Sequence, residues 1–178
     1  MRWCSARWVL ATSLVWPLAA QAPTYGLGRA AKPDEIKAWD SAISPDGKEL
    51  PPGSGSSAEG ARIYAANCAA CHGKTGKEGP NDVLVGGQGT LNTNKPVKTV
   101  GSYWPYATTV WDYINRAMPY NKPGSLTSDQ VYAVTAYLLS LNGIIKEDAV
   151  MNAKTLPQVK MPNRNGFIGD PRPDWKSH

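Results

Sequence analysis

The chain has 178 residues, of which 42% are hydrophobic and 19% are charged, and its formal net charge at pH 7 is +5. A chain of this length forms one domain with room for extensions. Two of the positive charges lie in a predicted signal peptide, whose removal lowers the charge to +3, and the lysines are spread along the chain. The charge therefore excludes a nucleic-acid-binding protein and supports at most a weak preference for an acidic partner.

Residues 1–20 have the features of a secretory signal peptide. Arg2 and Arg7 precede an apolar run over residues 8–20, which ends in small residues. The run has about 13 residues, whereas a membrane-spanning helix needs roughly 20. We therefore expect export to the periplasm, cleavage after Ala20 and no stable insertion into a membrane.

Residues 21–53 are predicted to form an extension and linker before the compact domain. A proline at position 33, followed by two acidic residues, predicts a short helix that ends near Trp39. The sequence Ser-Pro-Asp-Gly at residues 44–47 predicts a turn, and residues 50–57 have the proline, glycine and serine content of a semi-rigid linker.

Residues 54–143 are predicted to form the compact domain, with three helices. Ser56 and Glu59 have the spacing of a capping box, which places the first helix from about residue 57 toward Cys71. A second helix is predicted over residues 108–117, and the proline at position 119 ends it, because proline disfavours helical geometry in the residue before it.

The third helix of the domain is predicted to begin at a second capping box, formed by Thr127 and Gln130. It is expected to end at Asn142, where the following Gly143 adopts the left-handed conformation. One face carries an apolar stripe that we expect to pack against the first helix at Gly60 and Tyr64, with glycine allowing the two backbones to approach. The stripe consists of Val131, Val134, Leu138 and Leu141.

Residues 144–178 contain four prolines and few predicted elements, so we expect an irregular C-terminal tail. The sequence leaves two roles open for this tail. It either wraps the domain or docks a partner.

The sequence CAACH, residues 68–72, is the most specific motif in the chain. C-x-x-C-H is the attachment motif of c-type haem. On one helical turn Cys68 and Cys71 can reach the two vinyl groups of a porphyrin, and His72 is then placed below the iron. The cofactor predicted from this motif is one covalently bound haem c.

The cysteine pair has three other interpretations. Structural zinc requires four thiolate or imidazole ligands, and the exported chain has two thiols, His72 and His178. Thioredoxin-like chemistry expects a βαβ unit near the motif, and the sequence predicts none. A disulfide between Cys68 and Cys71 suits an oxidising compartment, but it closes almost no loop and links nothing distant.

The small size of the predicted domain also favours haem. A core of this size, poor in Phe, Ile and Leu, is marginally stable alone, and a haem supplies apolar mass. Residues 103–113 hold five aromatic side chains. These are candidates either for the wall of a haem pocket or for ordinary core positions.

Met118 is the predicted second axial ligand of the iron, opposite His72. It follows a predicted helix and precedes a proline, so the chain can cross the haem there and return. Met161 is the alternative ligand, and methionine also serves simply to fill cores. Ligation by His and Met raises the reduction potential and suits electron transfer, whereas an open sixth position suits gas binding or peroxide chemistry.

The set of motifs CAACH, AMP at residues 117–119 and TAYLLSLN at residues 135–142 resembles the class I c-type cytochromes. The resemblance implies an all-α fold in which three or more helices surround one covalently bound haem. Irregular N- and C-terminal extensions would flank this domain.

Longer strings resemble the cytochrome subunit of sulfane dehydrogenase, the SoxD family of the Sox thiosulfate-oxidation system. They include GGQGTL, PVKTVGSYWPYATTVWDYINRAMPYN and LPQVKMPNRNGFIGDPRPD. The resemblance implies that Cys68 and Cys71 form the thioether bonds, that His72 is the proximal ligand and that Met118 is the distal one. It also implies a molybdenum-containing partner that supplies electrons and other cytochromes that receive them.

The chain departs from some members of that family, which have two haem domains, because it contains a single C-x-x-C-H motif. This departure favours a free-standing carrier or the cytochrome subunit of a related sulfite dehydrogenase as alternatives. A haem enzyme, a gas sensor and an anchoring subunit are further alternatives that the sequence leaves open. The leading hypothesis is a periplasmic single-haem electron-transfer protein partnered with a molybdoenzyme in sulfur oxidation.

Overall fold

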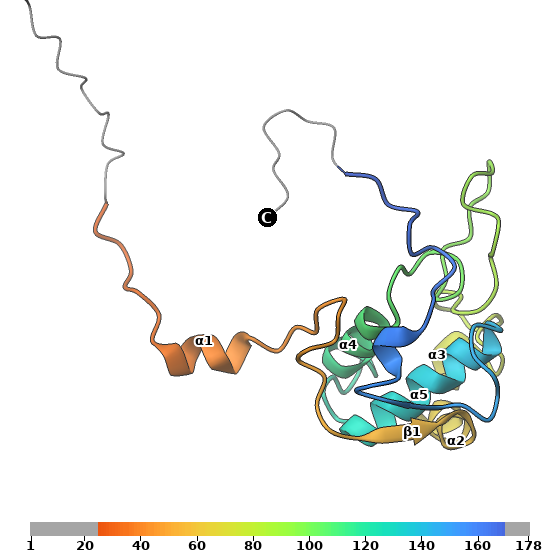
Figure 1. Ribbon diagram of the computed structural model, residues 1–178, viewed down its shortest axis with the longest axis horizontal. Helices are drawn as coiled ribbons and strands as arrows, with labels where there is room; N and C mark the ends of the chain where they lie inside the picture. The colour runs from red at the N-terminus through yellow and green to blue at the C-terminus, as the bar shows by residue number, and fades with distance from the viewer. Residues whose placement is uncertain (1–24, 170–178) are drawn as a thin grey trace, which may run out of the picture. The chain divides into compact units, whose positions relative to one another are not determined.

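Helices form most of the regular structure in the computed structural model, which describes residues 25–169. This architecture confirms the predicted all-α class, with irregular segments on both sides of the helices (Figure 1). The predicted signal peptide and the end of the tail, including His178, lie outside the described residues. In chain order the elements are α1 (Pro33–Trp39), β1 (Ser54–Ser56), α2 (Ser57–Asn67), α3 (Ala69–His72), α4 (Ala107–Ala117), α5 (Ser128–Leu141), β2 (Val150–Asn152) and the 3₁₀ turn η1 (Leu156–Gln158).

The predicted helix ends are confirmed at several positions. Both capping boxes form, at Ser56 before α2 and at Thr127 before α5. Gly143 follows α5 with a φ of +67°, the left-handed conformation expected of a glycine after a helix. Between residues 25 and 169, no helix has the length and apolar character needed to cross a membrane.

The chain divides into two units, and the first contains the described residues 25–38. Within it Arg29 forms an ion pair with Glu35. Apolar side chains in this segment are exposed, among them Leu27, which is 88% exposed, and Ile36. The second unit begins at Trp39 and contains the remaining elements.

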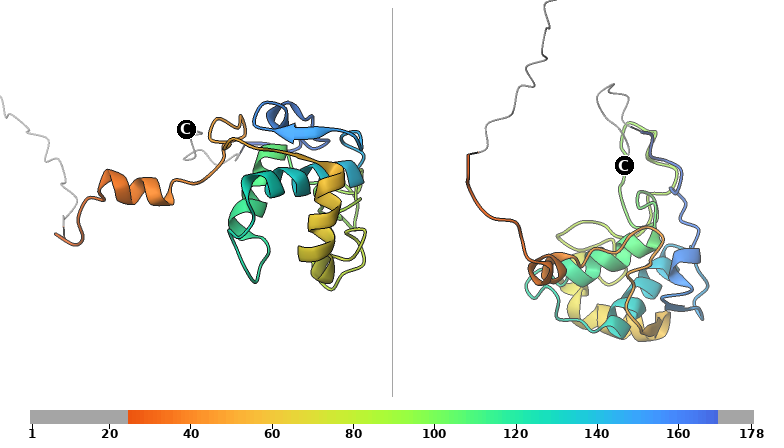
Figure 2. Two further views of the ribbon diagram at one scale, coloured as in Figure 1. Left: turned by 90° about the horizontal axis from the view of Figure 1, so that it is seen from below. Right: turned by 60° about the vertical axis from the view of Figure 1, so that its left-hand side comes forward.

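Helix α5 packs against α2 and α4, whose C-terminal ends lie on the same side of it (Figure 2). The contact with α2 is made at Gly60, as predicted. A Cβ atom built on Gly60 would lie 1.9 Å from the carbonyl oxygen of Ala133. Glycine is therefore required here because the two helix backbones touch.

Replacing this glycine, G60A, is expected to destabilise the protein even though alanine is the better helix former. The propensity gain is about 1 kcal/mol, but the clash with a backbone carbonyl forces α2 and α5 apart, and we expect a net loss of about 1–3 kcal/mol. Urea unfolding measures the change. The control is A65G at an exposed position of the same helix, which costs about 1 kcal/mol from propensity alone. Unchanged or increased stability of G60A would contradict the close packing.

The tail packs against the opposite side of α5. Strand β2 pairs antiparallel with β1, with Met151 opposite Gly55. Leu156 is 0% exposed and Met161 is 3% exposed. Residues 150–161 therefore wrap the domain, one of the two roles that the sequence left open.

This packing explains why more residues of α5 are buried than the predicted apolar stripe contains. Val131, Val134 and Leu138 of the stripe are buried as expected, while Leu141 is only half-buried. Five further residues of the helix are also buried, because β1 and the tail cover a second face that the stripe did not predict. They are Tyr132, Ala133, Thr135, Ala136 and Leu139.

The segment before β1 packs on α4. The backbone N–H of Ile43 donates to the Asp112 carboxylate at 3.1 Å, and the Thr108 hydroxyl donates to the carbonyl of Pro45, also at 3.1 Å. Core residues thus lie on both sides of the predicted domain limits at 54 and 143, which stay a prediction.

Candidate functional site

The CAACH motif lies where α2 ends and a single turn of helix, α3, begins. Cys68 joins the two with φ −122° and ψ −34°. Its carbonyl accepts hydrogen bonds from the backbone N–H of Cys71 at 3.1 Å and of His72 at 3.0 Å. Both thiols are free. The structure therefore places the two cysteines and the histidine on one turn, as the sequence predicts.

The environment of Cys68 differs from that of a redox-active thiol. Burial, with a smaller contribution from the neighbouring Cys71, raises the pKa of the Cys68 thiol to about 11. Thiols that carry out disulfide exchange have lowered pKa values, because the thiolate is the reactive form. The geometry thus disfavours the thioredoxin-like alternative.

His72 is held by a backbone carbonyl that the sequence analysis did not identify. Its Nδ1 lies 2.8 Å from the carbonyl oxygen of Asp82. Because a carbonyl can only accept, Nδ1 carries the proton and donates it, and Nε2 keeps its lone pair for a metal. This is the arrangement that fixes the tautomer and ring orientation of metal-binding histidines.

The loop after the motif presses closely against it. A Cβ on Gly79 would lie 2.1 Å from the carbonyl oxygen of Cys71. The N–H of Asn81 donates to that same carbonyl at 3.0 Å, and the Tyr64 hydroxyl donates to the carbonyl of Gly73 at 2.9 Å. The glycine-rich composition of this loop is the only sequence signal of the contact, and it does not identify which carbonyl His72 meets.

Met118 comes from a separate element. It directly follows α4 in extended conformation, with φ −121° and ψ 147°. Like Cys68, it is partly buried and packs against the main hydrophobic core. Met161 and Met151 are instead buried among core residues. Met118 therefore leaves a helix end, as predicted, while the alternative ligand Met161 fills the core.

The aromatic side chains of residues 103–113 are divided between core and surface. Trp111 is buried and packs on Tyr132, with ring centres 5.4 Å apart. Trp104 and Tyr113 form an edge-to-face pair at 5.6 Å, and Tyr113 is exposed. Trp111 is thus an ordinary core residue, while Trp104 and Tyr113 stay candidates for the wall of a haem pocket.

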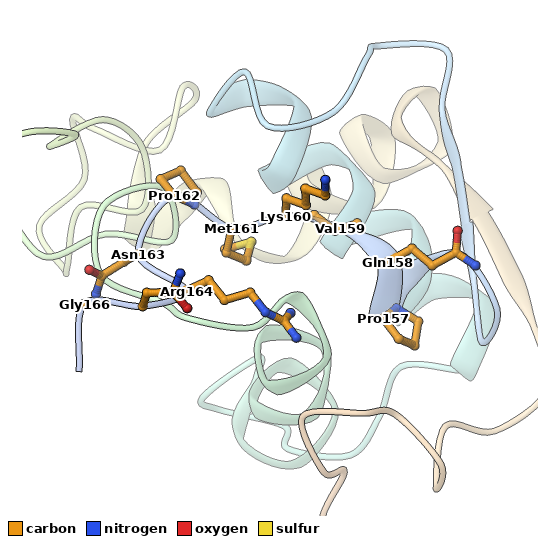
Figure 3. Close-up of a pocket in the computed structure, with 10 residues that line it drawn as sticks. Pro157, Gln158, Val159, Lys160, Met161, Pro162, Asn163, Arg164 and Gly166 are labelled. Atoms are coloured by element: carbon orange, nitrogen blue, oxygen red, sulfur yellow. The ribbon is translucent and has the colours of Figure 1, made fainter. Parts of the chain in front are cut away.

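A shallow hollow lies on the tail, lined by residues 157–166 (Figure 3). Arg164 extends from it toward α4, and its guanidinium lies 4.9 Å from the ring centre of Tyr106. The Asn163 amide donates to the carbonyl of Tyr103 at 2.7 Å. The lining contains no Asp, Glu, His or Cys. The contacts of Asn163 and Arg164 hold this part of the tail against residues 103–106.

The residues present fit a covalently bound haem better than a zinc ion. Between residues 25 and 169 no group of three or more His, Cys, Asp or Glu side chains could hold a metal ion. A haem iron needs only one imidazole from the motif. The hydrogen bond from His72 Nδ1 to the Asp82 carbonyl leaves Nε2 of that imidazole available to the iron. The buried Nε1 of Trp111 also has no hydrogen-bond partner among the described residues, and a bound group with carboxylates could supply one.

The family model described as Cytochrome c matches residues 57–142. A crystal structure titled sulfane dehydrogenase SoxCD from Paracoccus pantotrophus contains a chain with 48% sequence identity and a TM-score of 0.74. The similarity covers 85% of this chain and 75% of that one. No curated protein sequence matches the chain significantly.

Proposed function

Because the chain belongs to the cytochrome c family and therefore carries covalently bound haem c, we propose that it is a periplasmic single-haem electron-transfer protein. Cys68 and Cys71 form the thioether bonds, and His72 and Met118 bind the iron on its two sides. The observation that carries these assignments is the 2.8 Å contact of His72 Nδ1 with the Asp82 carbonyl, since it leaves Nε2 as the ligand atom.

Each residue has a defined task in this function, while the haem supplies one-electron redox chemistry when bound. The cysteines hold the group covalently, so that it stays with the protein in both redox states. The Asp82 carbonyl orients the His72 ring. Met118 would hold the haem iron together with His72, and a His/Met ligand pair would raise the reduction potential and close the iron to external ligands.

The electron donor that we propose is a molybdenum-containing sulfane dehydrogenase active in thiosulfate or sulfur oxidation, with other cytochromes as acceptors. Support comes from the extent of the similarity. About 151 residues match the chain in the SoxCD structure, and the cytochrome c region accounts for 86 of them at most. Only 36 residues follow position 142, so at least about 29 of the matched residues precede position 57. The similarity therefore includes part of the N-terminal extension.

A second candidate function is a free-standing carrier or the cytochrome subunit of a sulfite dehydrogenase. The observation that favours it is the single C-x-x-C-H motif, since some SoxD-type cytochromes have two haem domains. Purification of the protein from the native periplasm, followed by metal analysis, separates the two. Co-purified molybdenum with sulfane-oxidising activity supports the first function, and a protein that elutes alone supports a free carrier.

The electron-transfer role itself is tested by spectroscopy of the purified protein. We expect low-spin iron in both redox states and no binding of carbon monoxide. High-spin iron that binds carbon monoxide readily would overturn this role in favour of a gas sensor or a haem enzyme.

Residues 25–39 are a candidate for partner docking, since residues 150–161 of the tail pack on the domain. Trp39 is 87% exposed, and Leu27 and Ile36 are exposed as well. Deletion of residues 25–39 is expected to abolish co-purification with the molybdoenzyme while leaving the haem spectrum unchanged. Pull-down with the purified partner measures this, and W39A is the milder variant. Undiminished binding by the deletion variant would remove the extension from the interface.

A further inference from the structure

We propose that Asn142, at the C-terminal end of α5, is a positioning residue for the proximal histidine. Its side chain holds the segment 82–86, and this segment presents the Asp82 carbonyl to His72. The inference rests on the proposed role of His72 as an iron ligand, and it adds a residue 70 positions further along the chain.

The His72 ring is oriented through its Nδ1 atom. Among residues 25–169, the His72 ring makes one hydrogen bond, from Nδ1 to the Asp82 carbonyl, at 2.8 Å. A donor bond of this kind increases the basicity of the other ring nitrogen and fixes the ring plane. The position of one backbone carbonyl therefore affects both the orientation and the electron donation of the ligand.

Asp82 meets His72 through its backbone carbonyl. The position of this carbonyl therefore depends on the hydrogen bonds that hold the neighbouring backbone. The N–H of Leu84 donates to the carbonyl of Gly76 at 2.8 Å, and the N–H of Val100 donates to the carbonyl of Leu84 at 3.2 Å. These bonds tie the segment to other loop residues. One residue before Asp82, the N–H of Asn81 donates to the carbonyl of Cys71 in α3 at 3.0 Å, which ties the start of the segment to the motif itself.

Asn142 supplies a second link, from the far end of the segment to helix α5. Its Oδ1 accepts from the N–H of Gly86 at 2.9 Å. Its Nδ2 donates to the carbonyl of Leu84 at 3.2 Å and to the carbonyl of Leu138 within α5 at 2.8 Å. One amide thus binds the segment at two backbone atoms and joins it to the buried helix, only two residues beyond Asp82.

Two further contacts close the space around this amide. The Thr99 hydroxyl donates to the carbonyl of Gly86, so the same segment is held from its other side. A Cβ on Gly101 would lie 2.2 Å from Oδ1 of Asn142. The amide is therefore packed tightly as well as hydrogen-bonded, so a shift of the amide would also shift the segment 82–86.

A simpler role for Asn142 is that of a helix cap, through the bond to Leu138. The two roles make different predictions. Loss of a cap lowers stability and leaves the haem unaffected. Loss of a positioning residue also weakens the hydrogen bond at His72 and changes the properties of the iron.

The experiment compares N142A with N152A in the holoprotein. Asn152 accepts two backbone hydrogen bonds through Oδ1 in the turn after β2, away from the segment 82–86. We expect N142A to raise the reduction potential, because a weaker Nδ1 hydrogen bond makes His72 a poorer donor to ferric iron. The expected shift is up to about tenfold in the reduction equilibrium, or about 59 mV for one electron. N152A is expected to leave the potential unchanged.

NMR of the reduced, low-spin protein gives a second measurement. We expect faster solvent exchange of the His72 ring Nδ1 proton in N142A than in the wild type. T99V, which removes the hydrogen bond to Gly86 from the other side, is expected to shift both readouts in the same direction by a smaller amount. It provides the test if N142A fails to fold.

Equal potentials and equal ring-proton exchange in N142A and wild type, or in T99V and wild type where N142A does not fold, would overturn the proposal and leave Asn142 as a helix cap. The proposed function is judged separately, by H72A. If H72A keeps the wild-type spectrum, His72 is not the iron ligand, and the electron-transfer site itself has been misassigned. The two failures are therefore distinguishable.

Discussion

The double variant C68A/C71A is expected to lose covalent haem completely. Both thioether bonds of the proposed site come from these side chains, which lie on one turn of the chain and are the two free cysteines of the described residues. Denaturing electrophoresis followed by haem-dependent peroxidase staining measures the loss, after expression with a working cytochrome maturation system. The wild type should stain, and the double variant should not.

The single variants and one matched cysteine control sharpen this test. C68A and C71A each keep one possible thioether bond, so weaker but detectable staining is expected. C4A changes a cysteine in the predicted signal peptide and should stain like the wild type. A double variant that still stains would contradict the assignment of both residues.

The second large effect is expected from M118A. Removal of the proposed distal sulfur opens the iron to external ligands and lowers the reduction potential by on the order of a tenth of a volt, within the span of about 0.8 V that axial ligands control. The absorption spectrum, carbon monoxide binding and a redox titration measure the change. Unaltered spectrum and potential would show that Met118 is not a ligand.

M161A is the matched methionine control for M118A. Met161 is a tail residue whose side chain is buried in the core, so its truncation is expected to cost about 2–5 kcal/mol of stability. We expect no change in carbon monoxide binding. If M161A, and not M118A, altered the spectrum, the distal ligand would have to be reassigned to the tail.

Features encoded within a few residues could be predicted from the sequence. The capping boxes at Ser56 and Thr127 each depend on a side chain three positions away, and the haem motif depends on five consecutive residues. The Gly60 contact was also predictable, since an apolar stripe on one helix needs a partner face. These features follow from helical periodicity and local hydrogen bonding.

Features that depend on distant backbone could not be predicted. The acceptor for His72 is a carbonyl, which every residue has, so nothing in the sequence identifies Asp82. The burial of α5 on a second face requires a tail whose prolines indicate only irregular structure. The link from Asn142 to Leu84 spans 58 positions and leaves no periodic pattern. Tertiary packing, rather than local propensity, decides all three.

The pairing of β1 with β2 means that the domain is completed by one of the last segments to be synthesised. Strand β2 and η1 are among the last ordered segments to be made, so until they arrive β1 covers that side of α5 without them. A chain interrupted before residue 150 would contain the whole cysteine motif and yet lack the buried side chains of Met151, Leu156 and Met161 that complete the core. Such fragments would be prone to aggregation and to proteolysis. Completion of the core thus depends on the C-terminal segment reaching β1.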